Sequence, residues 1–205
     1  MIIAGAGGHA LEVLDILIQQ QILHPAVYGE KINPHWPSAF PAFSQLDQVS
    51  EWLASNPSFV LGLGAPEYRR KLYGEFTKRG GIHHPLRGAL SVLSPTAVAD
   101  AADLMSGTFV GAQAKLGIGV LVNAGAQVHH EVEVGDFSVI NPRAVLLGAC
   151  QVGSDCFIGA QATVLPGVRI GDRAIIGAGT VIIRDVPSDS TMVGVPGRML
   201  IKSQG

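Results

Sequence analysis

Charged residues are scarce in this 205-residue chain: only 15% of them are Asp, Glu, Lys or Arg, against roughly 25% in ordinary globular domains. The 14 basic and 16 acidic residues give a net charge of −2. No run of Lys and Arg is long enough to follow a phosphate backbone. We therefore expect no nucleic-acid partner.

Long hydrophobic runs and targeting signals are also missing. No stretch of about 18 uninterrupted apolar residues is present to span a bilayer. The N-terminus has no basic region followed by an apolar run and a small-residue cleavage site. The sequence therefore predicts a soluble, cytoplasmic protein with no membrane partner.

Cysteine is rare as well, with only Cys150 and Cys156. Two cysteines in a chain of this length do not make the disulfide framework of a small secreted domain. We interpret both as small buried hydrophobic residues.

Aliphatic residues and glycine, in contrast, are abundant and regularly spaced. An aliphatic residue recurs at every sixth position from Val92 to Ile182, sixteen times in one register. A small or β-branched residue lies four positions after each of the first fifteen, from Thr96 to Thr180. Three hexapeptides make one turn of a triangular parallel β-helix, whose interior takes both kinds of residue. In this register both cysteines point inward and are structural.

Glycine directly follows the aliphatic residue at seven places, where a turn can require positive φ. These glycines are Gly111, Gly117, Gly135, Gly153, Gly159, Gly171 and Gly177. The whole repeat holds only 11 charged residues in 91, so its outer faces are weakly charged. Such faces suit burial against identical copies, and we predict a homotrimer with parallel prism axes.

The segment before the repeat has another pattern. An apolar run over residues 1–4 leads into a glycine turn and a helical pattern, and further strands are expected at residues 26–28 and 59–63. This order predicts a small Rossmann-like βαβαβ domain in residues 1–85, followed by the β-helix domain with a short C-terminal segment in residues 86–205. The helix after the third strand is rich in Lys and Arg, which we interpret as a solvated face. Its basic residues are Arg69, Arg70, Lys71, Lys78 and Arg79.

The glycine turn is a candidate phosphate cradle, because a helix N-terminus offers free N–H groups and a positive dipole end. Gly5, Gly7 and Ala10 match the NAD fingerprint G-x-G-x-x-A, with Glu30 near the place of a ribose-binding acid. The match is weak, and about 85 residues leave little room for a second half of the fold. A mononucleotide-sized ligand is therefore preferred over NAD.

Two adjacent histidines, His129 and His130, are the only ones in the repeat. Catalytic zinc takes three protein ligands, so we expect no metal site. An imidazole outside a β-helix is a natural general base, and Glu131 can hold the second nitrogen of His130.

Four features together resemble the bacterial sugar acetyltransferases of the PglD/NeuD type. They are the hexapeptide prism, the start Gly5-Ala-Gly-Gly-His9, the segment His130-Glu-Val-Glu-Val-Gly-Asp-Phe137, and the C-terminal Val193-Gly-Val-Pro-Gly-Arg198. The resemblance covers nearly the whole chain. It implies a left-handed β-helix trimer that transfers acetyl from acetyl-CoA to an amino group, or less often a hydroxyl, of a nucleotide-linked or free sugar destined for glycans.

The resemblance also implies roles for individual residues. The family motif H-[DE]-x-x-[IV]-G-[DE]-F selects His130 over His129 as the general base, with Glu131 as the acid that orients it. Gly7, Gly8, His9, Glu30 and Gly64 are the implied sugar-nucleotide contacts, and Val139, Ala160 and Ala178 are the implied contacts to CoA. Two positions depart from the family: Lys31 replaces a second acid, and Val139 replaces a histidine that contacts the CoA arm.

The preferred interpretation is thus an acetyl-CoA-dependent N-acetyltransferase acting on a nucleotide-linked amino sugar by direct transfer, with no metal. One alternative is an O-acetyltransferase acting on a sialic acid or similar sugar hydroxyl. Another is a non-catalytic hexapeptide scaffold or nucleotide-binding module.

Overall fold

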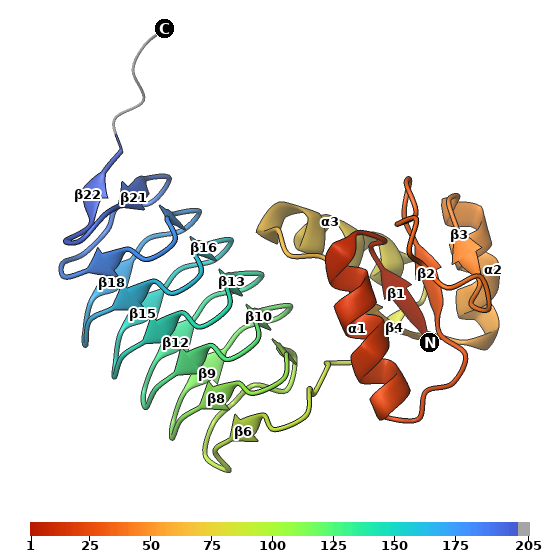
Figure 1. Ribbon diagram of the computed structural model, residues 1–205, viewed down its shortest axis with the longest axis horizontal. Coiled ribbons are helices and arrows are strands. Elements are labelled where there is room, and N and C mark those ends of the chain that lie inside the picture. Colours follow the sequence, from red (N-terminus) through yellow and green to blue (C-terminus); the bar gives the residue numbers. More distant parts are fainter. Residues whose placement is uncertain (201–205) are drawn as a thin grey trace, which may run out of the picture. The chain divides into compact units, whose positions relative to one another are not determined.

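The computed structural model describes residues 1–200 and divides into two compact units, Met1–Leu86 and a second that begins at Arg87. The first unit mixes helices and strands, and the second is a stack of short strands (Figure 1). No helix within the described residues is long and apolar enough to cross a membrane.

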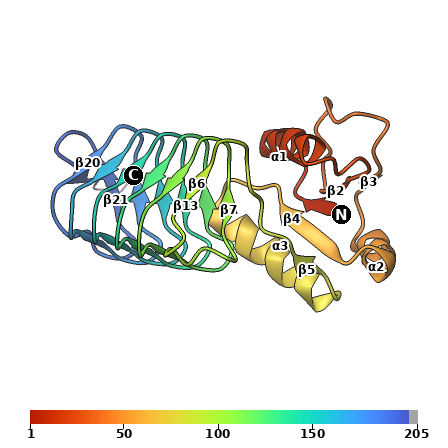
Figure 2. The ribbon, with the colours of Figure 1, turned by 90° about the horizontal axis from the view of Figure 1, so that it is seen from below.

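The first unit is a three-layer α/β fold around a parallel sheet. Its strands are β1 (Ile2–Ala4), β2 (Ala26–Tyr28), β3 (Ala42–Phe43), β4 (Ser58–Leu61) and β5 (Ile82–His83), in the spatial order β3-β2-β1-β4-β5. Its helices are α1 (Gly8–Gln19), α2 (Leu46–Ser55) and α3 (Pro66–Lys78). In Figure 2, α1 lies on one face of the sheet, and α2 and α3 lie on the other.

This sheet has two strands more than the sequence predicts. β3 and β5 are each only two residues long, which is too short to show an alternating pattern of apolar and polar residues. Phe59, Phe76 and Tyr28 form the aromatic core between the sheet and α3, with ring centroids 5.2 to 5.7 Å apart. Aliphatic residues from the strands and helices, among them Ile2, Leu53 and Leu61, complete this core.

One basic residue of α3 contradicts the prediction of a solvated face. The side chain of Arg69 is fully buried, with 0% exposure, whereas its neighbours Arg70 and Lys71 are exposed. Arg69 lies on the face of α3 that packs into the unit, and helical spacing brings it to the same side as Phe76. The sequence prediction failed here because it treated all basic residues of the helix alike.

The second unit is a three-sided parallel β-helix of very short strands. From β7 to β20 each strand pairs with the strand three hexapeptides further on, as in Leu121↔Val139 and Val128↔Leu146, and at the end of the stack β21 pairs with β22 in antiparallel orientation. One sheet contains β7 (Asp103–Leu104), β10 (Leu121–Val122), β13 (Val139–Ile140), β16 (Phe157–Ile158), β19 (Ile175–Ile176), β21 (Thr191–Val193) and β22 (Arg198–Met199). The second contains β6 (Val92–Leu93), β8 (Phe109–Val110), β11 (Gln127–Val128), β14 (Val145–Leu146), β17 (Thr163–Val164) and β20 (Val181–Ile182). The third contains β9 (Lys115–Leu116), β12 (Glu133–Val134), β15 (Gln151–Val152) and β18 (Arg169–Ile170).

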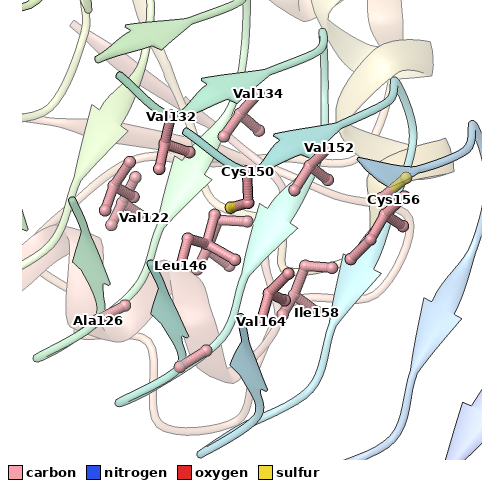
Figure 3. Close-up of a cluster of buried hydrophobic side chains, with 14 of the residues drawn as sticks. Val122, Ala126, Val132, Val134, Leu146, Cys150, Val152, Cys156, Ile158 and Val164 are labelled. Carbon is pink, nitrogen blue, oxygen red and sulfur yellow. The ribbon is translucent and has the colours of Figure 1, made fainter. Parts of the chain in front are cut away.

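The six-residue series occupies the interior from Leu104 to Ile182, where every aliphatic member is at most 6% exposed. Figure 3 shows members of this series from the middle of the stack, such as Val122, Leu146 and Val164, with the buried Cys150 and Cys156. Both thiols are free and fully buried, and burial raises the pKa of Cys150 to about 12. A thiol with so high a pKa is not a nucleophile near neutral pH, which agrees with the structural role expected for it.

The first two members of the series do not belong to the interior. Val92 and Val98 are each 55% exposed, and Thr96 is exposed too. The first coil pairs with the second at a distance in the sequence that is one residue shorter than between Leu104 and Ile182, as in Leu93↔Val110. Val92 is therefore aligned with the outward Phe109, and the prediction for Val92, Val98 and Thr96 is wrong.

The predicted role of the seven turn glycines is also wrong. Positive φ occurs at the third residue after the inward aliphatic in every turn from Gly107 to Gly179, with φ between 56° and 72°. The seven glycines lie at the first position instead, where a Cβ would meet the next coil. At Gly135 it would lie 2.6 Å from the backbone nitrogen of Ser154. Close packing of successive coils, not backbone conformation, explains these glycines.

Candidate active site

His130 and Glu131 lie in the turn after β11 and touch each other. Nδ1 of His130 is 3.1 Å from Oε2 of Glu131, and their side chains are 63% and 65% exposed. A neutral imidazole that donates from Nδ1 to the carboxylate keeps the lone pair of Nε2 for a substrate proton. The pair can therefore act as a general base with an orienting acid.

The backbone of the β-helix produces this pairing. Glu131 is the third residue after Val128 and has φ 59°, the left-handed conformation found in every turn of the repeat. Its backbone N–H donates to the carbonyl of Ala112 in the previous coil at 2.9 Å, and the carbonyl of His130 accepts from Ala149 in the next. Both residues are thus fixed by main-chain hydrogen bonds, while their side chains face outward.

Gly148, one coil further on, gives the imidazole its place. A Cβ on Gly148 would lie 2.3 Å from Cε1 and 2.5 Å from Nε2 of His130, and the three atoms nearest to it all belong to that ring. No positive φ is required at this glycine. The absence of a side chain at Gly148 is therefore what allows the ring its position. Sequence reasoning missed this residue, although it occupies the position equivalent to His130 in the next coil.

His129 has different surroundings. Its Nε2 is 3.2 Å from Oε1 of Gln127, and its ring packs against Phe109 with centroids 5.5 Å apart. These contacts hold His129 against the sheet surface, so the geometry favours His130 as the base.

In the first unit, the predicted nucleotide contacts lie at the carboxyl ends of three neighbouring strands. Gly7 is the N-cap of α1, which follows β1, and Gly8 begins that helix. Glu30 follows β2, and Gly64 follows β4. A Cβ at Gly7, Gly8 or Gly64 would meet no atom within 4 Å, so all three leave open space for a ligand. This edge of a parallel α/β sheet is where ligands bind.

His9 and Glu30 contribute the polar groups of this edge. Nδ1 of His9 is 3.0 Å from Oε2 of Glu12. Glu30 borders a cavity of about 590 Å³, together with Tyr28, the start of α2 and Arg79. Burial, and then the charge of Glu30, raise the pKa of the Tyr28 hydroxyl.

Two of the implied CoA contacts lie along one edge of the β-helix. Ala160 and Ala178 occupy equivalent positions in successive coils, and the carbonyl of Ala160 accepts a hydrogen bond of 2.8 Å from the N–H of Gly179. Ala178 is exposed. Val139 lies in β13, and its side chain is fully buried. These CoA contacts stay predictions.

A groove that the sequence did not indicate runs over the third sheet, with a volume of about 870 Å³. The outward residues of β9, β12, β15 and β18 line it: Lys115, Glu133, Gln151 and Arg169. Nζ of Lys115 is 2.8 Å from Oε1 of Glu133, and this contact raises the pKa of Lys115. Within residues 1–200 no three His, Cys, Asp or Glu side chains are grouped to hold a metal ion.

Comparison with known protein families finds one matching segment in each unit of the chain. Residues 1–76 match the PglD N-terminal domain, and residues 149–184 match the bacterial transferase hexapeptide repeats. The resemblance stated from the sequence is confirmed in both domain types. No curated protein sequence matches the chain.

Solved structures extend the likeness over the whole chain. The acetyltransferase domain of PglB from Neisseria gonorrhoeae is 25% identical with a TM-score of 0.90, and the match covers 97% of this chain and 98% of that one. PerB from Caulobacter crescentus, solved with CoA and GDP-perosamine, is 27% identical with a TM-score of 0.83, over 97% and 96% of the two chains. WeeI from Acinetobacter baumannii, at 20% identity, 97% and 98% coverage and a TM-score of 0.66, shares the fold. The fold is accordingly a Rossmann-like unit followed by a left-handed β-helix.

Proposed function

We propose that this chain is an acetyl-CoA-dependent N-acetyltransferase that acts on a nucleotide-linked amino sugar. The observation that carries the proposal is the His130–Glu131 pair, which lies outside a hexapeptide β-helix and is oriented as a general base. The structural relatives support it: PerB was solved with CoA and GDP-perosamine, and perosamine N-acetyltransferase was also solved with one histidine replaced by asparagine or by alanine.

The proposed reaction is direct transfer in one site. The sugar amine attacks the carbonyl carbon of the acetyl thioester as Nε2 of His130 removes a proton from the nitrogen. Backbone N–H groups stabilise the negative oxygen of the tetrahedral intermediate. Its collapse breaks the carbon–sulfur bond, and the proton passes from the imidazolium to the leaving thiolate, giving the amide and free CoA. Glu131 orients the ring and stabilises its charged form.

The two units have separate roles in this proposal. The first unit binds the nucleotide sugar at Gly7, Gly8, His9, Glu30 and Gly64, where the helix N-terminus of α1 suits a phosphate. The second unit binds acetyl-CoA, with contacts at Ala160, Ala178 and the main chain of Val139. The substitution of Lys31 for the family's second acid affects which nucleotide is accepted.

We also propose that the protein is a homotrimer. In the second sheet the outward side chains of β8, β14 and β20 are the apolar Phe109, Val145 and Val181, and those of β11 and β17 between them are the uncharged Gln127 and Thr163. Those of the third sheet are mostly charged. A face without charged side chains suits burial against a second copy better than the charged third sheet does. Light scattering at micromolar concentration should give three times the chain mass, and a monomeric mass would contradict the proposal. Cytoplasmic location stays a prediction from the sequence.

The deciding experiment is thiol release from acetyl-CoA with a panel of UDP-, dTDP- and GDP-linked amino sugars, including GDP-perosamine. Non-amino nucleotide sugars and sialic acid are the controls. Turnover confined to the amino sugars is the expected result. Turnover only with the hydroxyl controls would favour the O-acetyltransferase alternative. No turnover and no CoA binding would favour the scaffold alternative.

A further inference from the structure

Arg69 is the largest fully buried side chain of the chain's described residues, and it carries a charge. It lies in the first turns of α3, directly after the connection from β4. Its Nη1 donates a hydrogen bond of 2.8 Å to the backbone carbonyl of Leu63, which precedes the helix. The guanidinium is thus bound to the segment that leads into its own helix.

Helix docking does not require an arginine at this position. Phe76 is fully buried in the core of the first unit, and Leu72 and Tyr73 pack against that core. Burial of a guanidinium costs desolvation free energy that an apolar side chain of similar length avoids. What only the arginine supplies is a rigid set of donors aimed at a backbone carbonyl.

The carbonyl that Arg69 binds belongs to a segment in close contact with the glycine turn after β1. A Cβ on Gly5 would lie 2.5 Å from Cγ of Leu63, so the Leu63 side chain lies directly on Gly5. The backbone N–H of Gly62 donates to the carbonyl of Ala4 at 2.9 Å. The position of Leu63 therefore fixes the two segments relative to each other.

These segments carry the open positions of the strand-end site. Gly64 directly follows Leu63, and Gly7 and Gly8 lie just after Gly5 in the glycine turn. Gly64, Gly7 and Gly8 each have open space where a Cβ would be. Movement of the Leu63 carbonyl would displace Gly64 and, through Leu63 and Gly5, the glycine turn.

We propose that Arg69 is a positioning residue for the nucleotide-sugar site. Its hydrogen bond to Leu63 holds the segment 62–65 against the glycine turn, in the geometry that the nucleoside diphosphate requires. The proposal rests on the proposed function, because it takes the strand-end site as the nucleotide site. Arg69 itself is buried and acts through the loop.

The test uses the full chain and three variants. Arg69→Met removes the donors but keeps the side-chain length, and Arg69→Lys keeps the charge but not the planar donor set. Lys71→Met is the matched control, because it removes a positive charge from an exposed position of the same helix. Calorimetry measures the Kd of UDP, GDP and dTDP, and steady-state kinetics measures the KM of acetyl-CoA. Thermal melting checks folding.

Arg69→Met should raise the Kd of the nucleotide that binds the wild-type chain about tenfold or more and leave the KM of acetyl-CoA unchanged, and Lys71→Met should behave like the wild type. Arg69→Lys should stay folded and raise the Kd by a smaller factor. Unchanged nucleotide binding in folded Arg69→Met would overturn the proposal. If Arg69→Met does not fold, Arg69→Lys decides in its place: a raised Kd supports the proposal and wild-type binding overturns it. A wild-type chain that binds none of the three nucleotides would instead contradict the proposed function.

Discussion

The two units of this chain hold their functional groups by different means. In the β-helix, each strand pairs with the strand one coil away, and the interior takes only two positions of every hexapeptide. The outward turn positions take no part in the core. The positions of His130 and Glu131 therefore depend only on the local backbone and on Gly148. In the first unit, Ile2 pairs with Phe59, and the glycine turn depends on Leu63 and on a buried arginine. In the β-helix, the residues proposed for catalysis are therefore not those that stabilise the fold. In the α/β unit, residues that pack the fold also shape the proposed binding site.

The strongest test of that separation is His130→Ala. We expect kcat with saturating acetyl-CoA and amino sugar to fall about 10²- to 10⁴-fold, as is typical for loss of a general base. The melting temperature should not change, because the side chain is exposed. Thiol release and a melting curve measure the two effects. His129→Ala is the control and should keep most of the activity. Near-normal turnover in His130→Ala would refute the assignment.

The second prediction concerns how independently the units are stabilised. Leu146→Ala in the prism interior should lower the free energy of unfolding by about 2–5 kcal/mol, and Phe59→Ala in the first unit by about 3–5 kcal/mol. Both tryptophans, Trp36 and Trp52, belong to the first unit.

Urea unfolding followed by tryptophan fluorescence should therefore respond to Phe59→Ala, and far-ultraviolet circular dichroism should report the loss of the β-helix in Leu146→Ala. Equal shifts of both signals in both variants would mean that the two units unfold as one.

The same contrast governs what the sequence could predict. The β-helix is predictable between Leu104 and Ile182 because the distance in the sequence between paired residues is constant there, so the six-residue series identifies which residues point inward. It fails at Val92 and Val98, where the first coil is one residue shorter than the coils between Leu104 and Ile182. The spacing of aliphatic residues cannot reveal this change in pairing distance, since valine also occurs at exposed strand positions.

In the first unit the sequence predicted three strands and the glycine turn, but not β3, β5 or the burial of Arg69. Residues far apart in the chain decide these features, and no local pattern reports them. Gly148 was missed for a related reason: its partner is a side chain in the previous coil. Once His130 is chosen as the base, counting one coil of three hexapeptides forward leads to Gly148.

The third prediction tests whether Gly148 serves the base or the fold. Gly148→Ala should lower kcat roughly tenfold to a hundredfold, because the new methyl group occupies the place of the imidazole and displaces it. Stability should change by less than about 1 kcal/mol, since the residue has no positive φ and the exposed ring can move away. Kinetics and thermal melting on one preparation distinguish the effects.

Gly135→Ala is the matched structural control. Its Cβ would meet backbone of the next coil at 2.6 Å, so it should lose stability instead. Equal destabilisation by the two substitutions would show that Gly148 is another packing glycine.

The fourth prediction concerns the acid beside the base. Glu131→Gln should lower kcat by less than about tenfold, because the His130–Glu131 contact is exposed and such pairs contribute about 1 kcal/mol or less. The amide oxygen can still accept a hydrogen bond from Nδ1. Glu131→Ala removes the acceptor altogether, so kcat, measured by thiol release, should fall further in that variant than in Glu131→Gln. If instead Glu131→Gln matched the loss in His130→Ala, the acid would be essential and not only orienting.

The smallest effect is expected where the six-residue series leaves the interior. Val98→Ser should change the free energy of unfolding by less than about 0.5 kcal/mol, because the side chain is 55% exposed. The same change at Val110, which is 0% exposed, should cost several times more, since it places a hydroxyl in an apolar interior. Denaturant titration of both variants compares them directly. The six-residue spacing of the sequence treats Val98 and Val110 as equivalent. A difference between the two variants in the free energy of unfolding would therefore show that main-chain pairing, and not hydrophobic spacing, defines where the prism begins.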